Sequence, residues 1–141
     1  IESYISNFEI SAVDYIDEEG LLMAPAFAVS EMLKKANIEL QDFDFYEIHE
    51  AFAAQTLATI SAWESEEFCQ TKLGRNKAMG SFDRNKLNIK GGSLAIGHPF
   101  AATGARIVAT MSKLLREKGK GRGLISICTA GGMGVTAIME R

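Results

Sequence analysis

Histidine and cysteine are the residue types here best suited to proton transfer or covalent chemistry near pH 7, and each occurs twice. His98 stands between Gly97 and Pro99, and Cys128 ends the apolar run 124–128 directly before the small residues 129–132. Glycine allows close backbone approach and proline fixes one dihedral angle, so the imidazole is held in place, as a general base must be. A free thiol has a pKa of about 8.5 and needs a nearby base, while backbone N–H groups of a glycine turn can stabilise an oxyanion. The spacing suggests a His/Cys acid–base pair, with helix capping as the structural alternative for His98.

His49 and Cys69 carry weaker signals. His49 follows the short aromatic segment 43–48, and ligands gather beyond the carboxyl ends of strands in parallel sheets. A hydrogen-bonded structural histidine is the alternative. Cys69 lies in a polar segment and is expected to be an inert buried residue. The zinc pattern H-E-x-x-H is incomplete because position 53 is alanine, and two distant cysteines form neither a C-x-x-C pair nor a disulfide framework, so no metal site is expected.

Two glycine patterns superficially resemble nucleotide sites. Gly92 and Gly97 have the spacing of a phosphate-binding loop, but His98 stands where that loop requires lysine. The pattern 132–137 fits G-x-G-x-x-A, yet the residues after it are β-prone and the sequence ends before a helix, or an acidic residue about 20 positions further on, can follow. A nucleotide-binding module, which would bind NAD or ATP saturably in calorimetry, is therefore disfavoured.

The periodicity of apolar residues predicts an α/β fold with the element order βαβαβαββ. Alternating strands and helices favour a mainly parallel sheet with helices on both faces, and the short turn before the last strand favours an antiparallel final pair. The result would be a mixed five-stranded sheet. The polar segment 64–86 is expected to be a surface excursion. Strands are expected at residues 8–15, 43–48, 87–89, 124–128 and 134–139, and helices at about 25–37, 51–63 and 103–118.

Composition limits the class of protein. The sequence has 141 residues, of which 47% are hydrophobic and 23% charged, as expected for one globular domain with its own core. A net charge of −3 with dispersed basic residues makes nucleic acid an unexpected partner. No apolar run approaches the roughly 20 residues that span a bilayer, so membrane association is not indicated. The sequence opens at Ile1 without methionine, on what reads as the approach to a strand, so we expect a piece of a longer chain.

Three segments carry a family resemblance. HEAFAAQTLA at 49–58, GGSLAIGHPFAATGARIV at 91–108 and CTAGGMG at 128–134 resemble, in the same order, the three motifs of the C-terminal half of thiolases. The resemblance covers essentially the whole sequence. Histidine at position 49, where many thiolases have asparagine, is similar to the branch that works in fatty-acid β-oxidation complexes.

The resemblance implies cleavage of a 3-oxoacyl-CoA by coenzyme A to acetyl-CoA and a shortened acyl-CoA, or the reverse Claisen condensation. It implies that His98 activates a nucleophilic cysteine and, with His49, forms an oxyanion hole. Cys128 would exchange a proton with the acetyl-CoA carbanion, and the N–H of Ala130 would belong to a second oxyanion hole. Coenzyme A is then a substrate, and no cofactor or metal is expected. The loops that support these residues would contain Gly97, Pro99, Gly131 and Gly132.

The sequence also departs from the family pattern. Ala101 and Ala130 stand where many thiolases have glycine, and the acylated cysteine belongs to an N-terminal half that is absent. The resemblance thus implies that residues 1–141 are the C-terminal domain of a two-domain chain and are inactive alone. It implies packing against the N-terminal domain, a homo-oligomer, a hydratase/dehydrogenase subunit as a further partner, and a bacterial cytoplasm rather than a mitochondrion. The alternatives are an inert association module and a condensing enzyme of the same fold, although the latter usually has His or Asn at position 128.

Overall fold

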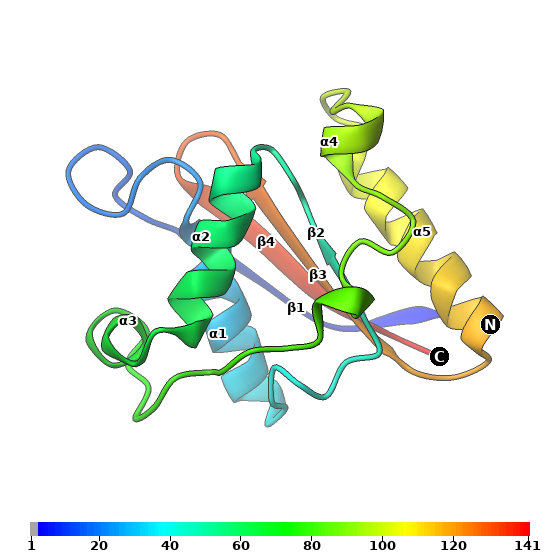
Figure 1. The fold of residues 1–141 in the computed structure, drawn as a ribbon, viewed down its shortest axis with the longest axis horizontal. Coiled ribbons are helices and arrows are strands. Elements are labelled where there is room, and N and C mark those ends of the chain that lie inside the picture. The colour runs from blue at the N-terminus through cyan, green and yellow to red at the C-terminus, as the bar shows by residue number, and fades with distance from the viewer. Residues whose placement is uncertain (1–2) are drawn as a thin grey trace.

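The computed structural model describes residues 3–141 and arranges them as a sheet with helices on both faces (Figure 1). Ile1, on which the expected approach to a strand begins, lies outside the described residues. The elements in chain order are β1 (Tyr4–Ala12), α1 (Ala24–Ala36), β2 (Phe45–Ile48), α2 (Ala53–Glu64), α3 (Glu66–Thr71), the 3-10 turn η1 (Arg84–Lys86), α4 (Ser93–Ile96), α5 (Thr103–Lys118), β3 (Arg122–Thr129) and β4 (Met133–Glu140).

The sheet has four strands in the order β1-β4-β3-β2. Only β2 and β3 run parallel, while β3–β4 and β1–β4 are antiparallel. The prediction of a mixed sheet covered on both faces is confirmed, but the expectation that it would be mainly parallel is wrong. The chain leaves β1 through α1 and enters the sheet again at the far edge, so β1 does not lie beside β2. Its only neighbour is β4, which runs the opposite way.

The strand predicted at 87–89 does not exist, so five strands and the order βαβαβαββ are wrong. Leu87 forms a single isolated bridge with Tyr46, and the N–H of Asn88 donates to the Tyr46 carbonyl over 2.8 Å. Asn88 has φ of 47°, in the left-handed region that no strand contains. Its side chain instead bonds to Ile48, donating to the carbonyl and accepting from the N–H over 2.9 Å each. One amide side chain thus replaces the ladder of a fifth strand.

The boundaries of the other helices and strands differ less from those predicted. Helix α5 spans 103–118 as predicted and ends at Gly119, which has φ of 93°. Helix α1 has Pro25 in its first turn and ends at Asn37 in a left-handed conformation. Strand β1 begins and ends earlier than predicted, because the carboxylate of Asp14 accepts hydrogen bonds from the N–H groups of Ile16 and Asp17 and makes a turn.

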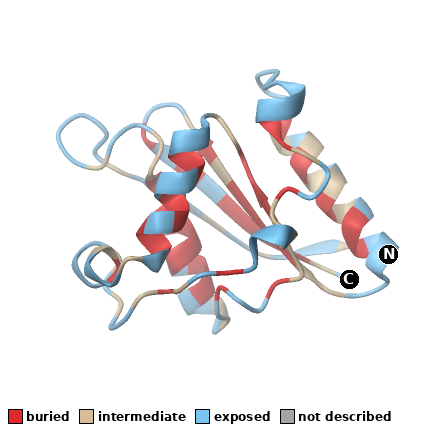
Figure 2. Ribbon diagram, viewed as in Figure 1, coloured by how far each residue is buried: buried red, intermediate tan, exposed pale blue. Residues whose placement is uncertain are grey.

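Each face of the sheet has its own core, and Figure 2 shows buried residues where α1, α2 and α5 meet the sheet. Alternation along β3 sends Leu124 to the core under α1 and α2, and Ile125 to the core under α5. The segment 64–86 lies mostly at the surface, as its polarity predicted, but it is not irregular throughout. It contains α3, and Cys69, Met79 and Phe82 enter the first core.

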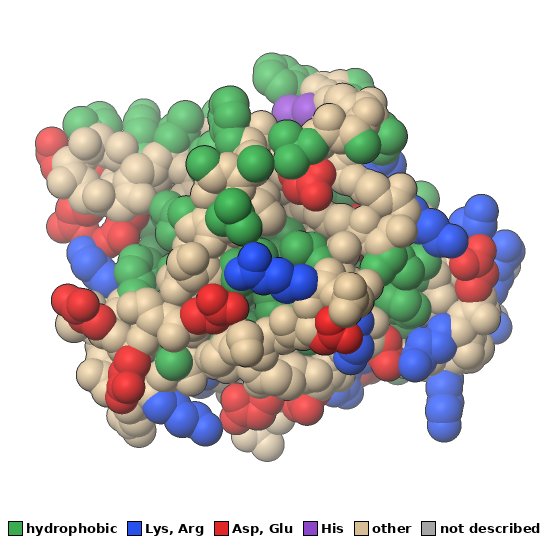
Figure 3. Space-filling view, viewed as in Figure 1, with side chains coloured by type: hydrophobic (Ala, Val, Ile, Leu, Met, Phe, Trp, Pro, Cys, Tyr) green, Lys and Arg blue, Asp and Glu red, His purple; other side chains and the backbone are tan. Residues whose placement is uncertain are grey.

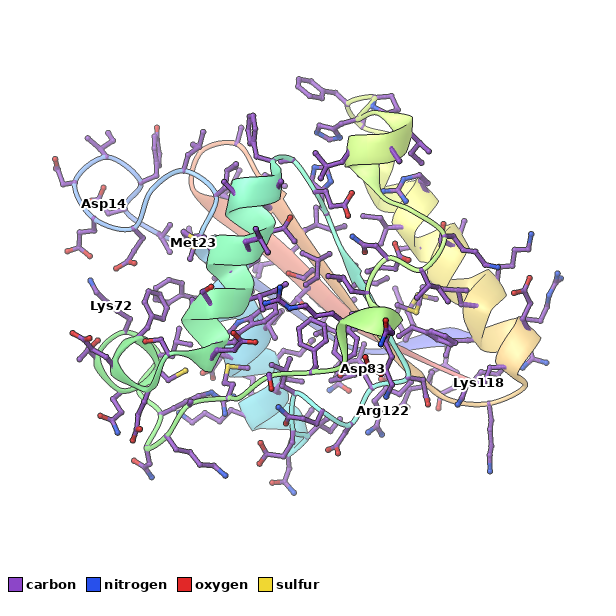
Figure 4. All side chains as sticks on the ribbon, viewed as in Figure 1. Asp14, Met23, Lys72, Asp83, Lys118 and Arg122 are labelled. Atoms are coloured by element: carbon purple, nitrogen blue, oxygen red, sulfur yellow. The ribbon has the colours of Figure 1, made fainter. Side chains whose placement is uncertain are left out.

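The two ends of the sheet differ in character. Figure 1 shows α4 and the loop into α5 at the same end as the β3–β4 turn. The carboxyl ends of β2 and β3 meet there because these strands are parallel. At the opposite end, where Figure 4 labels Lys118 and Arg122, Lys118 Nζ lies 2.8 Å from Asp44 Oδ1 and Arg122 Nε lies 2.6 Å from Glu140 Oε1.

Candidate active site

Two histidines from distant parts of the chain meet at the α4 end of the sheet. His49 directly follows β2 and is buried, and His98 lies in the exposed loop between α4 and α5. Their ring centroids are 4.3 Å apart, and the ring of Phe100 lies 4.9 Å from that of His98 on the outer side. Figure 3 shows an imidazole at this end of the surface among hydrophobic side chains. The structure therefore brings together the two histidines that the sequence singled out.

His98 is oriented through one of its ring nitrogens. Its Nδ1 lies 2.6 Å from the Oγ1 of Thr103, the buried first residue of α5. The start of α5 has no side-chain cap, so His98 does not cap the helix backbone as the structural alternative proposed. Its Nε2 has no hydrogen-bond partner within residues 3–141. A ring fixed at Nδ1 with Nε2 open is the arrangement that a general base requires.

His49 is buried and neutral. Its Nδ1 lies 3.1 Å from Ser93 Oγ, and its backbone N–H donates to the carbonyl of Ser126 over 2.8 Å, continuing the β2–β3 pairing. Burial, with the neighbouring His98 and Arg106 as smaller contributors, lowers the pKa of His49 to about 4. Burial and these hydrogen bonds agree with the alternative of a structural histidine. The contact with the ring of His98 is the observation that this alternative does not explain.

Glu50 and Asn88 connect the two histidine segments and were missed from the sequence. One Glu50 oxygen accepts from Asn88 Nδ2 over 2.8 Å, and the other accepts from the N–H of Leu94 over 3.1 Å. A Cβ at Gly92 would come within 2.3 Å of this carboxylate, so a side chain there would displace Glu50 from these hydrogen bonds. The Glu50 carboxylate thus occupies the glycine segment that resembled a phosphate-binding loop. The His-Glu pair of the first motif is the signal that pointed to Glu50, although the incomplete zinc pattern does not indicate this structural role.

The two cysteines have different surroundings. Cys128 lies buried near the carboxyl end of β3, opposite Gly134 of β4, and burial raises the pKa of its thiol. Within the described residues its thiol makes no hydrogen bond to either imidazole, so the suggested His/Cys pair is not a direct one. The Sγ of Cys69 lies 3.5 Å from the carbonyls of Ala62 and Trp63 beneath α2. The expectation that Cys69 is an inert core residue agrees with this position.

The turn 130–132 lies beside the end of β3 and contains two left-handed residues. Ala130 and Gly131 are exposed, and Gly131 and Gly132 have φ of 81° and 70°. A Cβ at Gly132 would approach the carbonyl of Val13 to 2.6 Å. The Gly132 carbonyl accepts a hydrogen bond from the N–H of Val13 over 2.9 Å. Glycine is therefore needed where the turn touches the end of β1. No group of three or more His, Cys, Asp or Glu in residues 3–141 is placed to hold a metal ion.

The loop that carries His98 contains a strained residue. Gly97 ends α4 with φ of 89°, and the Pro99 carbonyl accepts from the N–H of Ala102 over 3.1 Å. Ala101, which lies between Pro99 and the start of α5, has φ of 68°. A left-handed conformation costs a residue with a Cβ about 1–2 kcal/mol. The alanine that departs from the family pattern is thus a strained point three residues from the imidazole.

Replacing Ala101 by glycine should raise the free energy of unfolding by about 0.5–1 kcal/mol. Removing the Cβ relieves the left-handed strain, and the greater freedom of glycine in the unfolded chain offsets only part of the gain. Urea denaturation would measure the change. Ala109→Gly, at an exposed position inside α5, is the matched control and should lower stability by about 1 kcal/mol. Equal losses in both variants would contradict strain at position 101.

Glu47 is a buried carboxyl beside this site that sequence reasoning missed. It lies on β2 with 1% of its surface exposed, and its Oε1 has no hydrogen-bond partner among the described residues. Burial raises the pKa of Glu47 from its ordinary 4.5 to about 7, although Arg106 acts in the opposite direction. Its position within an apolar strand gave no signal in the sequence.

Glu47→Gln should stabilise the fold above neutral pH by about 3 kcal/mol and change nothing near pH 4. Because the folded-state pKa is raised, the contribution of Glu47 is full below pH 4.5 and is lost as pH rises through 7. His49 acts oppositely, since its lowered pKa makes stability fall as pH drops from 6.5 toward 4. Urea denaturation of the variant should therefore show stability rising from pH 4 to 6.5. Exposed Glu39→Gln is the control, and a variant that kept the wild-type pH profile would contradict the burial effect.

A family model described as the C-terminal domain of thiolase matches residues 1–141. The chain belongs to this family. The resemblance drawn from the three sequence motifs is confirmed.

Named relatives and solved structures agree with the thiolase assignment. The 3-ketoacyl-CoA thiolases of Shewanella woodyi and Shewanella baltica (strain OS185) are 49% and 47% identical over 137 residues, which is 97% of this thiolase domain and 31% of each relative. The acetyl-CoA acetyltransferase of Bacillus anthracis has a TM-score of 0.71 and 30% identity over 98% of this chain and 30% of its own. The acetyl-CoA acetyltransferase of Syntrophomonas wolfei has a TM-score of 0.77 and 28% identity, and the match covers 99% of this chain and 32% of its own.

The thiolase domain spans about three tenths of the length of these relatives. The two relatives compared by sequence come from bacteria of one genus. Among the helices of residues 3–141, none combines the length and hydrophobicity that a bilayer span requires.

Proposed function

We propose that this domain is the C-terminal catalytic part of a 3-ketoacyl-CoA thiolase. The enzyme would cleave a 3-oxoacyl-CoA with coenzyme A to acetyl-CoA and an acyl-CoA shortened by two carbons, or catalyse the reverse Claisen condensation. The observation that carries the proposal is the contact of His49 and His98, with ring centroids 4.3 Å apart, at the end of the sheet that also carries Cys128 and the turn 130–132.

In this function His98 acts on a nucleophilic cysteine outside the chain. Thr103 holds its Nδ1, so Nε2 is available to take the thiol proton. The thiolate attacks the keto carbon of the 3-oxoacyl-CoA, the carbon–carbon bond breaks, and the acyl group stays on the cysteine as a thioester. The bond electrons leave with acetyl-CoA as its enolate. Gly97 and Pro99 support the loop that presents His98.

Cys128 supplies the proton that the enolate needs. Because burial raises its pKa, the thiol stays protonated near pH 7 and can act as an acid. Coenzyme A then gives its thiol proton to the Cys128 thiolate and attacks the acyl thioester. The shortened acyl-CoA is released, and the freed nucleophilic thiolate takes back its proton from His98. In the reverse direction the Cys128 thiolate removes the α proton of acetyl-CoA.

Two sets of donors would stabilise the oxyanions. A neutral His49 next to His98 can hydrogen-bond the thioester oxygen as negative charge develops on it, which is an effect worth several kcal/mol in other enzymes. The N–H of Ala130, in the turn formed with Gly131 and Gly132, would serve the second oxyanion. Coenzyme A is a substrate here, and the reaction as written needs no cofactor.

An exposed apolar face on β1 and β4 is where we expect a partner domain to pack. Phe8 and Ile10 of β1 are 73% and 66% exposed, and Ile10 is paired with exposed Val135 of β4. Contiguous apolar surface of this kind marks an interface. We assign this face to the N-terminal domain that the longer relatives contain, with residues 1–141 as the C-terminal domain. A homo-oligomer, a hydratase/dehydrogenase subunit, fatty-acid β-oxidation and a bacterial cytoplasm belong to the same proposal.

A chimera tests the function directly. This chain would replace the matching 31% of the Shewanella woodyi enzyme, and cleavage of acetoacetyl-CoA by coenzyme A would be followed. We expect thiolysis by the chimera and none by the 141-residue chain alone, because the nucleophile is outside it. Size-exclusion chromatography and circular dichroism, with the unaltered enzyme as reference, establish that the chimera is folded. A folded but inactive chimera would contradict the function, and turnover by the isolated chain would contradict the missing nucleophile.

A further inference from the structure

A chain of polar contacts runs from α5 to the inner histidine. Ser93, at the start of α4, is 7% exposed, and its Oγ lies 3.1 Å from His49 Nδ1. On the other side of the same oxygen lies Nη2 of Arg106 from α5, at 3.5 Å. The proposed reaction uses neither Ser93 nor Arg106. Both are nevertheless connected to the one histidine that is closed off from solvent.

The hydrogens in the Arg106–Ser93–His49 contacts can be placed from the chemistry of the three groups. A guanidinium group only donates, so Arg106 directs a hydrogen toward Ser93 Oγ. The hydroxyl has one hydrogen of its own, and His49 Nδ1 is the acceptor within its reach. A neutral imidazole whose Nδ1 accepts carries its hydrogen on Nε2. In the order Arg106 to Ser93 to His49 the hydroxyl hydrogen has an acceptor, which it would lack among the described residues if His49 Nδ1 donated to Ser93 Oγ.

We infer that Arg106 and Ser93 are positioning residues that hold His49 as the Nε2–H tautomer. This role rests on the proposed function, in which His49 must present an N–H group to the thioester oxyanion. The opposite tautomer would donate from Nδ1 to Ser93 and turn a lone pair toward the negative oxygen.

Arg106 has a second effect on His49 through its charge. Three groups act electrostatically on His49. His98, in the loop after α4, and Arg106 on α5 disfavour its protonation, while Glu50, just after β2, favours it. The Nε of Arg106 is buried without a partner among the described residues, as is Oε1 of Glu47. Ser93 Oγ is thus one group that contacts the guanidinium, through Nη2.

Nitrogen NMR of the 141-residue chain tests the tautomer directly. Long-range ¹H–¹⁵N correlation distinguishes Nδ1–H from Nε2–H, and the chain has only two histidines, which His98→Asn would assign. We expect His49 to carry its hydrogen on Nε2 at pH 7. Wild-type protein with the hydrogen on Nδ1 would overturn the inference without any variant, so the test does not depend on a variant that folds.

Variants then test the two positioning residues. Ser93→Ala should give a mixture of tautomers, and Ser93→Thr, which keeps the hydroxyl, should restore Nε2–H. Arg106→Gln should raise the titration midpoint of His49 by about one pH unit, since a nearby cation shifts pKa values on that scale. Lys113→Gln removes a charge from the exposed side of the same helix and should change neither. Unchanged His49 signals in Ser93→Ala and Arg106→Gln would overturn the role.

Activity separates this inference from the function on which it rests. In an active chimera, Ser93→Ala should lower kcat about tenfold with little change in KM, the scale expected for one hydrogen bond. An inactive chimera whose His49 carries its hydrogen on Nε2 would contradict the thiolase function and leave the Ser93 contact established. An active chimera in which Ser93→Ala changes neither kcat nor the tautomer would overturn the positioning role alone.

Discussion

Cys128→Ala is expected to abolish exchange of the α protons of acetyl-CoA and to slow thiolysis at least about a thousandfold in the chimera. The variant removes the only thiol at this end of the described chain, and an enolate that finds no acid collapses back to substrate. Exchange in deuterated water, followed by NMR or mass spectrometry, measures the proton step alone. Because burial raises the pKa of the thiol, exchange in the wild type should increase with pH beyond the ordinary thiol range.

Cys69→Ala is the matched control for this experiment. It removes the same thiol group from a site that is fully buried beneath α2, where Sγ contacts the carbonyls of Ala62 and Trp63. The control should lower stability, as cavity-forming core substitutions do, but leave exchange and thiolysis near wild-type rates. A wild-type rate of α-proton exchange in Cys128→Ala, or equal losses of exchange and thiolysis in both variants, would contradict the assignment of Cys128 as the acid.

His98→Asn is expected to slow formation of the acyl-enzyme by about three orders of magnitude. Asparagine keeps a polar side chain of similar reach, but it cannot take a proton from the nucleophile. Rapid mixing with acetoacetyl-CoA would show the loss as a slow or absent burst, while α-proton exchange by Cys128 would be reduced less. The two variants therefore divide the reaction at the acyl intermediate.

Thr103→Val provides the graded comparison for His98. It removes the hydroxyl that lies 2.6 Å from Nδ1 but keeps the shape of a β-branched side chain at the start of α5. Its rate should fall between wild type and His98→Asn, because the imidazole remains but is no longer oriented. A burst of wild-type size in His98→Asn would show that another group activates the nucleophile.

Helix α5 and the three motifs were predictable because their signals are local. Apolar residues such as Ile107, Met111 and Leu115 repeat at helical spacing, and Gly119 ends the helix by its own backbone preference. The same holds for Cys128, whose place before a glycine turn could be read from neighbouring residues. The fifth strand failed because Leu87 and Ile89 look like strand residues, whereas Asn88 between them adopts a left-handed conformation and bonds to Ile48 from its side chain.

Residue types and their spacing were enough to predict the family and the α/β class and to single out His49, His98 and Cys128 as candidates, because that information lies along the chain. The folded structure was needed to show that β1 pairs with β4, that Cys69 is buried in the core, and that the histidine ring centroids are 4.3 Å apart. It also revealed Glu47, Ser93 and Arg106. Burial, pKa shifts and hydrogen-bond partners arise from groups that are distant in sequence, so no local pattern could show that one arginine on α5 acts on a histidine after β2.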